Sequence, residues 1–283
     1  MRAADIEKNL PQDIYVSVKH ALAEDIGTGD RTAHLIPTDA YSHATVISRE
    51  PAILCGIAWF SEVFTQLSKD IVINWRMRDG AQVKSGEILC ELSGPSASLL
   101  SGERTALNFL QTLSGTATET HKYVNAVRNT GVKILDTRKT IPGLRYAQKY
   151  AVTCGGGQNH RMGLFDAILI KENHISAAGS VTAALNTARS MKDVPIEIEV
   201  ENLQQLEEAL AAGAPRILLD NFSIQDLKSA SQITQGHAEL EASGAITLEN
   251  INIVAQTGVN FISIGSLTKH VRAIDLSMRF HNP

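Results

Sequence analysis

The chain has 283 residues, a formal net charge of −4, and 43% hydrophobic against 20% charged residues. This length can bury a large core and suits one large domain or two. The mild acidity argues against nucleic-acid binding, because phosphate backbones require a basic surface, and no uncharged apolar run is long enough to span a membrane. Three scattered cysteines and an N-terminus without an apolar signal core predict a cytoplasmic protein.

Residues 1 to 115 are predicted to form a first domain of mixed helix and strand. Helices are expected at 11–24 and 57–67, on either side of an alternating strand at 43–50. Residues 78–94 resemble the hairpins of lipoyl and biotinyl carriers, but no lysine is flanked as those carriers require, so a shared shape is the better explanation. A long helix is expected from about residue 102 to residue 128.

From Val132 the chain alternates between apolar runs and helical stretches, which predicts a parallel sheet covered by helices. This part of about 140 residues is short for a complete eight-fold barrel, which usually needs roughly 200 to 250, so an open α/β barrel is expected at 116–270. The tail, 271–283, is expected to pack back on the first domain. The predicted strands lie at 133–137, 167–171, 196–200, 216–220, 239–243 and 261–265.

The stretch from Leu135 to His174 is unusually basic, with six lysines and arginines and two histidines against three acids. Several of these residues follow predicted strands or surround a triple glycine instead of sharing one helix face. Because arginine matches carboxylate and phosphate well, the stretch predicts a pocket for a small polyanion. Cys154 is interpreted as a packed thiol, whereas His160, beside Arg161, is assigned a functional role.

The strand at 196–200, IEIEV, places Glu197 and Glu199 on one face because side chains alternate along a strand. If the apolar face meets helices, both carboxylates point into the barrel, where they require cations or a metal ion. An internal salt bridge and a ligand role are equally good interpretations of Glu197. Glu199 is favoured as a ligand residue, together with Asp220 at the end of the next strand, for ribose hydroxyls or Mg²⁺.

Two later loops are predicted to bind phosphate. Ser243, Gly244 and Ala245 precede a helix expected near Thr247, and Gly265 with Ser266 precedes another. Small residues before a helix expose backbone N–H groups to an anion, and barrels commonly bind phosphate with their last two loops.

The motifs EDIGTGDRTA, SGERTALNFLQTLSGTAT, DTRKTIPGLR, GGGQNHR, ILIKENH, IEIEV, LLDNF, EASGAI and SIGSLTKH occur in this order along nearly the whole chain. They closely resemble the quinolinate phosphoribosyltransferase family. That resemblance implies an α/β fold, with an N-terminal α/β sandwich and a C-terminal open α/β barrel. It also implies a homodimer with shared active sites, or a higher oligomer, that makes nicotinate mononucleotide from quinolinate and phosphoribosyl pyrophosphate with Mg²⁺.

The resemblance also assigns site residues. Those implied for quinolinate and pyrophosphate are Arg104, Thr137, Arg138, Lys139, His160, Arg161 and Lys171. Lys139, Lys171, Glu199 and Asp220 are the expected catalytic residues. Glu199 and Asp220 would hold the ribose and its magnesium, and the two small-residue loops would take the 5′-phosphate. Ala245 departs from the second glycine of many relatives, and alanine there would cost about 1 kcal/mol if φ were positive.

Two alternatives remain open from the sequence. One is a related phosphoribosyltransferase for another acid, such as the homologues found with molybdate transport genes. The other is a non-catalytic module that binds anionic metabolites. The paired acids Glu199 and Asp220 favour catalysis, because a pocket that only binds anions has no need of carboxylates.

Overall fold

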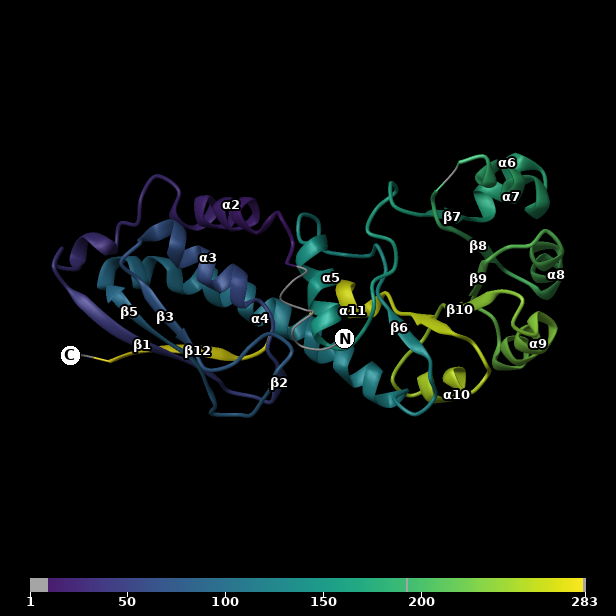
Figure 1. Cartoon of the computed structure of the whole chain (residues 1–283). Helices are drawn as coiled ribbons and strands as arrows, with labels where there is room; N and C mark the ends of the chain where they lie inside the picture. The colour runs from purple at the N-terminus through teal and green to yellow at the C-terminus, as the bar shows by residue number, and fades with distance from the viewer. Residues whose placement is uncertain (1–9, 192, 282–283) are drawn as a thin grey trace. The chain divides into compact units, whose positions relative to one another are not determined.

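The computed structural model describes residues 10–191 and 193–281. The N-terminal segment from which the absence of a signal core was inferred lies partly outside this range, as do the last two residues of the tail. The chain divides into two compact units, each built from separate stretches of sequence (Figure 1). Unit 1 contains residues 1–121, 140–156 and 267–283, and unit 2 contains residues 122–139 and 157–266. No helix in the described part of the chain combines the length and apolar character that crossing a membrane would require.

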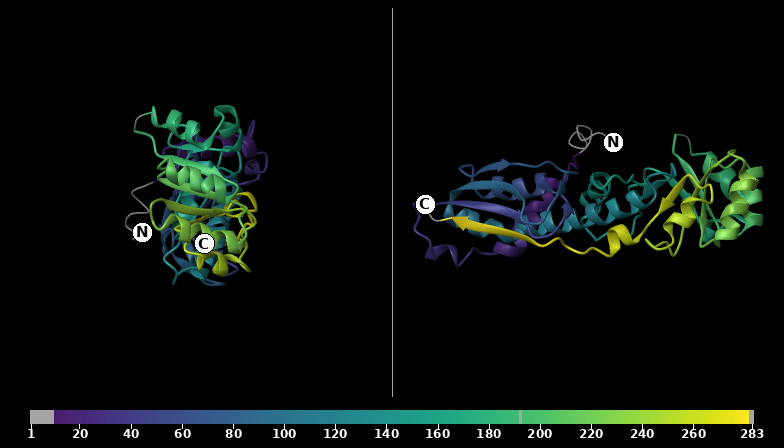
Figure 2. Two further views of the ribbon diagram at one scale, coloured as in Figure 1. Left: turned by 90° about the vertical axis from the view of Figure 1, so that its right-hand side faces the viewer. Right: turned by 90° about the horizontal axis from the view of Figure 1, so that it is seen from below.

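Unit 1 is built on a four-stranded antiparallel sheet in the order β12-β1-β5-β3. The C-terminal strand pairs with β1, with Val46 opposite Met278, so the tail of the chain forms one edge of the N-terminal sheet (Figure 2). A short second sheet joins β2 to β4. The strands are β1 (Tyr41–Ser48), β2 (Ala52–Ile53), β3 (Val72–Trp75), β4 (Gln82–Val83), β5 (Ile88–Pro95) and β12 (Leu276–His281).

Helices of unit 1 bury an aromatic core together with this sheet. Trp59, Phe60 and Phe64 of one helix are fully buried, and the Phe60 ring packs edge-on against Trp75 of β3, with 5.2 Å between ring centroids. The fold prediction of an N-terminal domain that packs helices on an antiparallel sheet is confirmed. The helices that contribute residues are α2 (Ile14–Ile26), η2 (Ala33–Leu35), α3 (Ile57–Leu67), α4 (Ser96–Ala126), α5 (Arg145–Cys154) and α11 (Ser266–Lys269).

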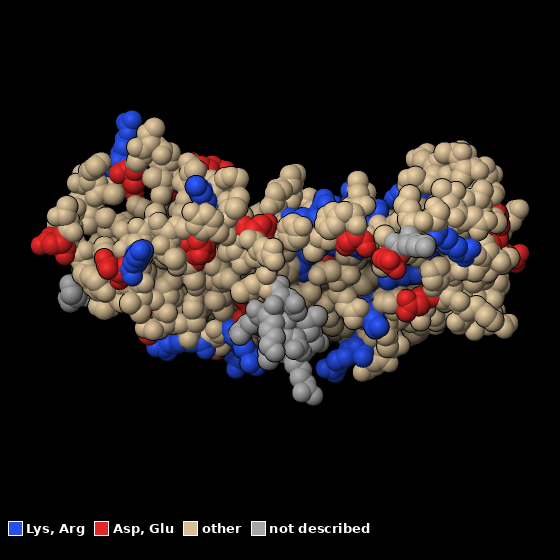
Figure 3. Space-filling model, turned by 45° about the horizontal axis from the view of Figure 1, so that its top comes forward, with Lys and Arg blue, Asp and Glu red and all other residues tan. Residues whose placement is uncertain are grey.

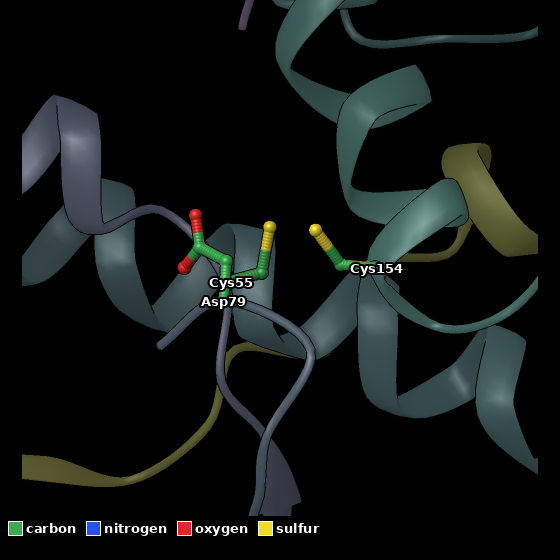
Figure 4. Close-up of side chains that lie close together, drawn as sticks. All are labelled: Cys55, Asp79 and Cys154. Atoms are coloured by element: carbon green, nitrogen blue, oxygen red, sulfur yellow. The ribbon is translucent and has the colours of Figure 1, made fainter. Parts of the chain in front are cut away.

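A buried polar group fixes the start of α3. Asp79 Oδ1 accepts the backbone N–H groups of Gly56 and Ile57 at 3.0 and 3.2 Å, and its Oδ2 accepts the Tyr150 hydroxyl at 2.8 Å. The thiols of Cys55 and Cys154 face each other beside this carboxylate (Figure 4). Because burial raises the pKa of Cys55 well above its usual range, that thiol stays protonated and packs as an apolar group, as interpreted for Cys154.

Unit 2 is built on a six-stranded parallel sheet in the order β6-β11-β10-β9-β8-β7. Within the described residues β6 and β7 form its two edges and do not pair, so the barrel is open, and all six predicted strands are present. Helices α7, α8 and α9 lie along one side of the sheet (Figure 1). The strands are β6 (Lys133–Leu135), β7 (Ile168–Ile170), β8 (Ile196–Val200), β9 (Arg216–Asp220), β10 (Glu239–Ser243) and β11 (Phe261–Ser263).

Connecting helices start where the sequence provides caps. Ser180, Asn202 and Ser223 each accept a backbone N–H from the first turn of the helix that follows, which removes one unpaired donor. On the face drawn in Figure 3, basic and acidic side chains are interspersed. The helices of unit 2 are α6 (Glu172–Ala178), α7 (Val181–Arg189), α8 (Leu203–Ala211), α9 (Ile224–Thr234) and α10 (Ile251–Ala255).

Candidate active site

A cavity of about 640 Å³ lies at the carboxyl edge of the parallel sheet in unit 2. Every strand of the sheet contributes at or just beyond its last residue, because parallel strands all end at the same edge. The cavity is lined by most of the residues that the sequence suggested, namely Thr137, Arg138, Lys139, His160, Arg161, Lys171, Glu199, Asp220, Ser243, Gly244, Ala245 and Gly265.

Cations dominate one wall of this cavity. Arg138 carries a buried Nε that has no hydrogen-bond partner within the described residues. Burial, together with the neighbouring charge of Arg138, lowers the pKa of Arg161, as expected where two guanidinium groups are held close together. Lys139 lies over Gly265, where an added Cβ would approach its Cδ to 3.1 Å. An anion bound at this wall would supply the acceptor that Arg138 Nε lacks.

Carboxylates line the same cavity. Lys171 Nζ lies 2.5 Å from Glu199 Oε2, and Asp220 Oδ2 accepts a hydrogen bond from Asn221 at 2.9 Å. Among the described residues, the second oxygen of each carboxylate makes no hydrogen bond. Oxygen atoms of this kind suit Mg²⁺ or ribose hydroxyls, so the donor set fits the implied metal.

The loop after β10 differs from the prediction in one respect. The expected helix near Thr247 is wrong, because α10 begins only at Ile251 and has a single turn. Gly244 adopts a φ of 129°, and a Cβ there would lie 2.5 Å from Asn221 Oδ1. Ala245 does not have positive φ, so its methyl group carries no backbone strain. The glycine that this loop requires is therefore Gly244.

Ser266, the last of the residues suggested for phosphate, begins α11 and has a buried Oγ without a hydrogen-bond partner in the described part of the chain. It follows Gly265 on the cavity wall. An unpartnered hydroxyl beside an open loop offers a donor to an anion.

His160 anchors a buried ionic cluster on the inner side of the cavity. Its Nε2 lies 2.8 Å from Glu197 Oε2 and 3.6 Å from Glu241 Oε1. Arg216 bridges the two carboxylates, with its Nε 3.2 Å from Glu197 Oε1 and its Nη2 against Glu241 Oε2. Glu197 thus forms an internal salt bridge, one of the two interpretations that the sequence left open.

These contacts shift three ionisation equilibria. Burial and the charge of Glu197 raise the pKa of Glu241 to about 7. Burial alone would raise the pKa of Glu197 and lower that of His160. Their mutual hydrogen bond and the charges around them together outweigh burial, so the pKa of Glu197 is lowered and that of His160 is raised. The cluster therefore holds one firmly ionised carboxylate and one that titrates near neutral pH.

The backbone around His160 is fixed by Asp136, which is fully buried at the end of β6. Its Oδ1 accepts the N–H of His160 at 2.9 Å, and its Oδ2 accepts the side-chain amide of Asn159 at 2.6 Å. The N–H of Arg161 donates to His160 Nδ1 at 2.8 Å. His160 and Arg161 consequently reach the cavity from a loop whose backbone these hydrogen bonds hold in place.

Two family models match most of the chain. The model of the quinolinate phosphoribosyl transferase C-terminal domain matches residues 116–279, and that of the N-terminal domain matches residues 28–114. The chain belongs to the quinolinate phosphoribosyltransferase family. It is 44% identical to a probable carboxylating nicotinate-nucleotide pyrophosphorylase of Bacillus subtilis, over 92% of this chain and 91% of that protein.

Solved structures of family members share the fold closely. A nicotinate-nucleotide pyrophosphorylase of Francisella tularensis has a TM-score of 0.93 and 50% identity, covering 96% of this chain and 98% of the other. The same activity is named for a Mycobacterium leprae relative that is 41% identical over 93% of this chain and 95% of its own length. The family that the motifs indicated is thus established across both units.

Arg104 is the one suggested quinolinate residue of this family member that does not line the cavity of unit 2. It lies on α4 in unit 1 and is exposed. The sequence reading also missed Asn221, Glu241 and Ser263, which do line the cavity. Glu241 could have been found, because it alternates with Ser243 on one strand as Glu197 does with Glu199. Asn221 gave no such signal, since its placement depends on a loop conformation with φ of 55°.

Proposed function

We propose that this chain joins quinolinate to phosphoribosyl pyrophosphate and releases nicotinate mononucleotide, pyrophosphate and carbon dioxide, as a step of NAD synthesis. The observation that carries the proposal is the cavity of unit 2, which brings together four lysines and arginines, a histidine and three carboxylates. Quinolinate has two carboxylate groups, and the second substrate has a phosphate and a pyrophosphate. Both require a cationic pocket, whereas the developing ribosyl cation requires nearby anions.

The cations are assigned to substrate binding. Arg138, Lys139 and Arg161 would pair with the quinolinate carboxylates, and the unpartnered Arg138 Nε supports this assignment. His160 lines the same cavity and would hold Arg161 in place through its ring. Lys139 and Lys171 would also reach the pyrophosphate. Thr137 adds its hydroxyl to the same wall and accepts the N–H of Lys139 at 3.1 Å. Arginine forks suit planar carboxylates, and mobile ammonium groups suit phosphate.

The carboxylates are assigned to the reaction itself. As pyrophosphate departs, the bond between the ribose carbon and the leaving oxygen breaks, and positive charge develops on the sugar. Glu199 and Asp220 would stabilise that charge while the pyridine nitrogen of quinolinate forms the new bond. The resulting positive ring nitrogen then accepts the electron pair released when the neighbouring carboxylate leaves as carbon dioxide, and a proton replaces it.

Magnesium is proposed as the cofactor, held with the ribose and pyrophosphate near Glu199 and Asp220. When bound, it neutralises charge on the leaving group. The 5′-phosphate is assigned to Ser243, Gly244 and Ala245 together with Gly265 and Ser266. For the first loop this assignment depends on backbone groups in the loop itself, because α10 starts too late to direct its N-terminus at the site.

Assembly and compartment are part of the proposal. We propose a homodimer in which Arg104 of one chain completes the cavity of the other, as the family resemblance implies; Arg104 belongs to unit 1 and the cavity to unit 2. The three cysteines are all free, which supports a reducing compartment such as the cytoplasm. A related enzyme acting on another acid remains a second candidate, but the number of cations favours a dicarboxylate over a monoacid.

The test is a stoichiometric assay with quinolinate, phosphoribosyl pyrophosphate and Mg²⁺. One nicotinate mononucleotide and one carbon dioxide should appear for each pyrophosphate released, and chelation of Mg²⁺ should stop all three together. Release of pyrophosphate without carbon dioxide would show that the acid substrate is not quinolinate. No pyrophosphate release with any acid would favour the non-catalytic module.

A further inference from the structure

Beneath the cation wall, five elements of unit 2 converge on a group that the proposed chemistry does not use. We call it the ionic clamp: Glu197 of β8, Arg216 of β9 and Glu241 of β10. Two-residue alternation places these side chains on the inner face of the sheet, on the same faces as Glu199, Asp220 and Ser243. The loop carrying His160 approaches from one side, and Phe261 of β11 lies under the Arg216 guanidinium, 4.0 Å from the ring centroid.

The clamp is largely buried, although Glu241 also borders the cavity. The Glu241 side chain is fully buried, Glu197 is 8% exposed, and Arg216 is 24% exposed. Ionised groups in such a place are strongly unfavourable unless each is paired, and a single lost partner leaves an uncompensated charge. The presence of two carboxylates and a guanidinium at this buried place therefore indicates a role that apolar side chains could not fill.

His160 is the one cavity residue that the clamp contacts directly through its ring. The ring nitrogens have separate partners: Nε2 faces Glu197 at 2.8 Å, and Nδ1 accepts the N–H of Arg161 at 2.8 Å. A nitrogen that accepts a hydrogen bond carries no proton, so this geometry specifies the neutral tautomer with its proton on Nε2. The same Arg161 contributes its guanidinium to the cavity wall.

We propose that Glu241 and Arg216 are positioning residues for quinolinate binding, which act by holding Glu197 against His160 and thereby fixing both its ring tautomer and the adjoining backbone of Arg161. This inference rests on the proposed use of quinolinate. It adds residues whose proposed role is exerted through His160. If Arg216 or Glu241 is changed, Glu197 can rotate away, the ring proton can move to Nδ1, and the Arg161 N–H then loses its acceptor.

The charges around the clamp are consistent with this arrangement. Glu241 faces Glu197, Arg216 and His160, and it also accepts a hydrogen bond from Ser263 of β11. Asp136 holds the backbone of His160 from the end of β6. The Arg216 guanidinium contacts both carboxylates and offsets their charge.

Two variants test the proposal, with one matched control. Glu241→Gln keeps the size of the side chain and removes its charge. Arg216→Lys keeps the charge but removes the fork that joins two carboxylates. Glu239→Gln makes the same chemical change as the first variant two residues earlier on β10, at an exposed position. Thermal melting verifies that each variant is folded.

The first measurement is the ¹⁵N spectrum of histidine-labelled protein, with the His160 signals assigned by their loss in His160→Gln. The wild type and Glu239→Gln should show a protonated Nε2 and an unprotonated Nδ1 at a pH above the folded pKa values of His160 and Glu241, where the ring is neutral and Glu241 is ionised. In Glu241→Gln the pattern should change to a mixture of tautomers. An unchanged His160 pattern in Glu241→Gln would overturn the proposal; if that variant does not fold, an unchanged pattern in Arg216→Lys has the same force.

The second measurement separates the two substrates. Misplacement of binding groups by about an ångström can reduce rates on the order of 100-fold, so KM for quinolinate should rise by about 10- to 100-fold in either variant. KM for phosphoribosyl pyrophosphate should stay within about 2-fold of the wild-type value, because its proposed contacts lie elsewhere. Equal changes in both would show a general structural defect and contradict the proposal. Failure of the wild type to use quinolinate would instead refute the proposed function and leave the spectral result intact.

Discussion

At the scale of single residues, Glu199 and Asp220 have similar proposed roles but different surroundings. Glu199 is paired with Lys171, whereas Asp220 accepts a hydrogen bond from the neutral Asn221. Loss of Glu199 would therefore also release a proposed substrate-binding lysine. Asp220 is the cleaner position at which to separate stabilisation of the reaction from binding of the acid.

We predict that Asp220→Ala lowers kcat by about 10²- to 10³-fold, the usual effect of removing one electrostatic contact from a transition state. The dissociation constant of quinolinate should change little, because the proposed partners of Asp220 are the ribose and magnesium. Steady-state kinetics and equilibrium binding of quinolinate measure the two quantities. A collapse of quinolinate affinity with kcat retained would mean that the role is misassigned.

The buried Glu241 gives a pH dependence of stability. Its pKa in the folded protein is about 7, above the ordinary value of 4.5, so between these pH values the folded state holds a proton that the unfolded state lacks. Stability should therefore fall as pH rises through this range. The raised pKa of His160 also stabilises the folded protein at low pH. This contribution is lost as pH rises through the folded pKa of His160.

We predict that Tm of the wild type falls more steeply between about pH 4 and pH 8 than that of Glu241→Gln, because this range brackets the interval from 4.5 to about 7. The glutamine does not titrate, so only the His160 contribution should remain in the variant. Differential scanning calorimetry at several pH values gives both slopes, with Glu239→Gln as the exposed control. Parallel slopes for wild type and Glu241→Gln would contradict the assignment.

At the scale of elements, the loop after β10 distinguishes two small residues that look interchangeable in sequence. Gly244→Ala should raise KM for phosphoribosyl pyrophosphate by at least about 10-fold, because positive φ is unfavourable for alanine and its Cβ would collide with Asn221 beside Asp220. Ala245→Gly should change KM by less than about 2-fold, since Ala245 has no such strain. Equal effects of the two changes would show that the loop has another conformation when substrate is bound.

The elements themselves were largely predictable from the sequence. Alternation and apolar runs predicted the six strands of unit 2, and the amphipathic pattern predicted α3 at its observed bounds, Ile57–Leu67. The start of α10 was not predictable, because Thr247 to Asn250 form a turn held by the Asn250 side chain, which accepts the Thr247 N–H at 2.9 Å. Of the ionic clamp, the sequence indicated only Glu197, because nothing in the sequence pairs Arg216 with Glu197 and Glu241 across three strands.

At the scale of the whole molecule, assembly decides whether the cavity is complete. If Arg104 serves the partner's cavity, mixing inactive Arg104→Ala and Lys171→Ala should restore activity. Half of randomly exchanged dimers would be mixed, and each would have one intact site of two, so recovery should reach about a quarter of wild-type activity. No recovery after subunit exchange has been verified, for example by mass spectrometry, would rule out the shared site.

The central claim is that the cavity of unit 2 recognises a dicarboxylate. Its most direct test is the ratio of kcat/KM for quinolinate to kcat/KM for nicotinate, measured with the same enzyme, phosphoribosyl pyrophosphate and Mg²⁺. Nicotinate lacks one carboxylate and would leave buried cations unpaired, a mismatch that can reduce kcat/KM by about 10⁴-fold or more. The account predicts a ratio of that size in favour of quinolinate. Comparable turnover of the two acids would contradict it.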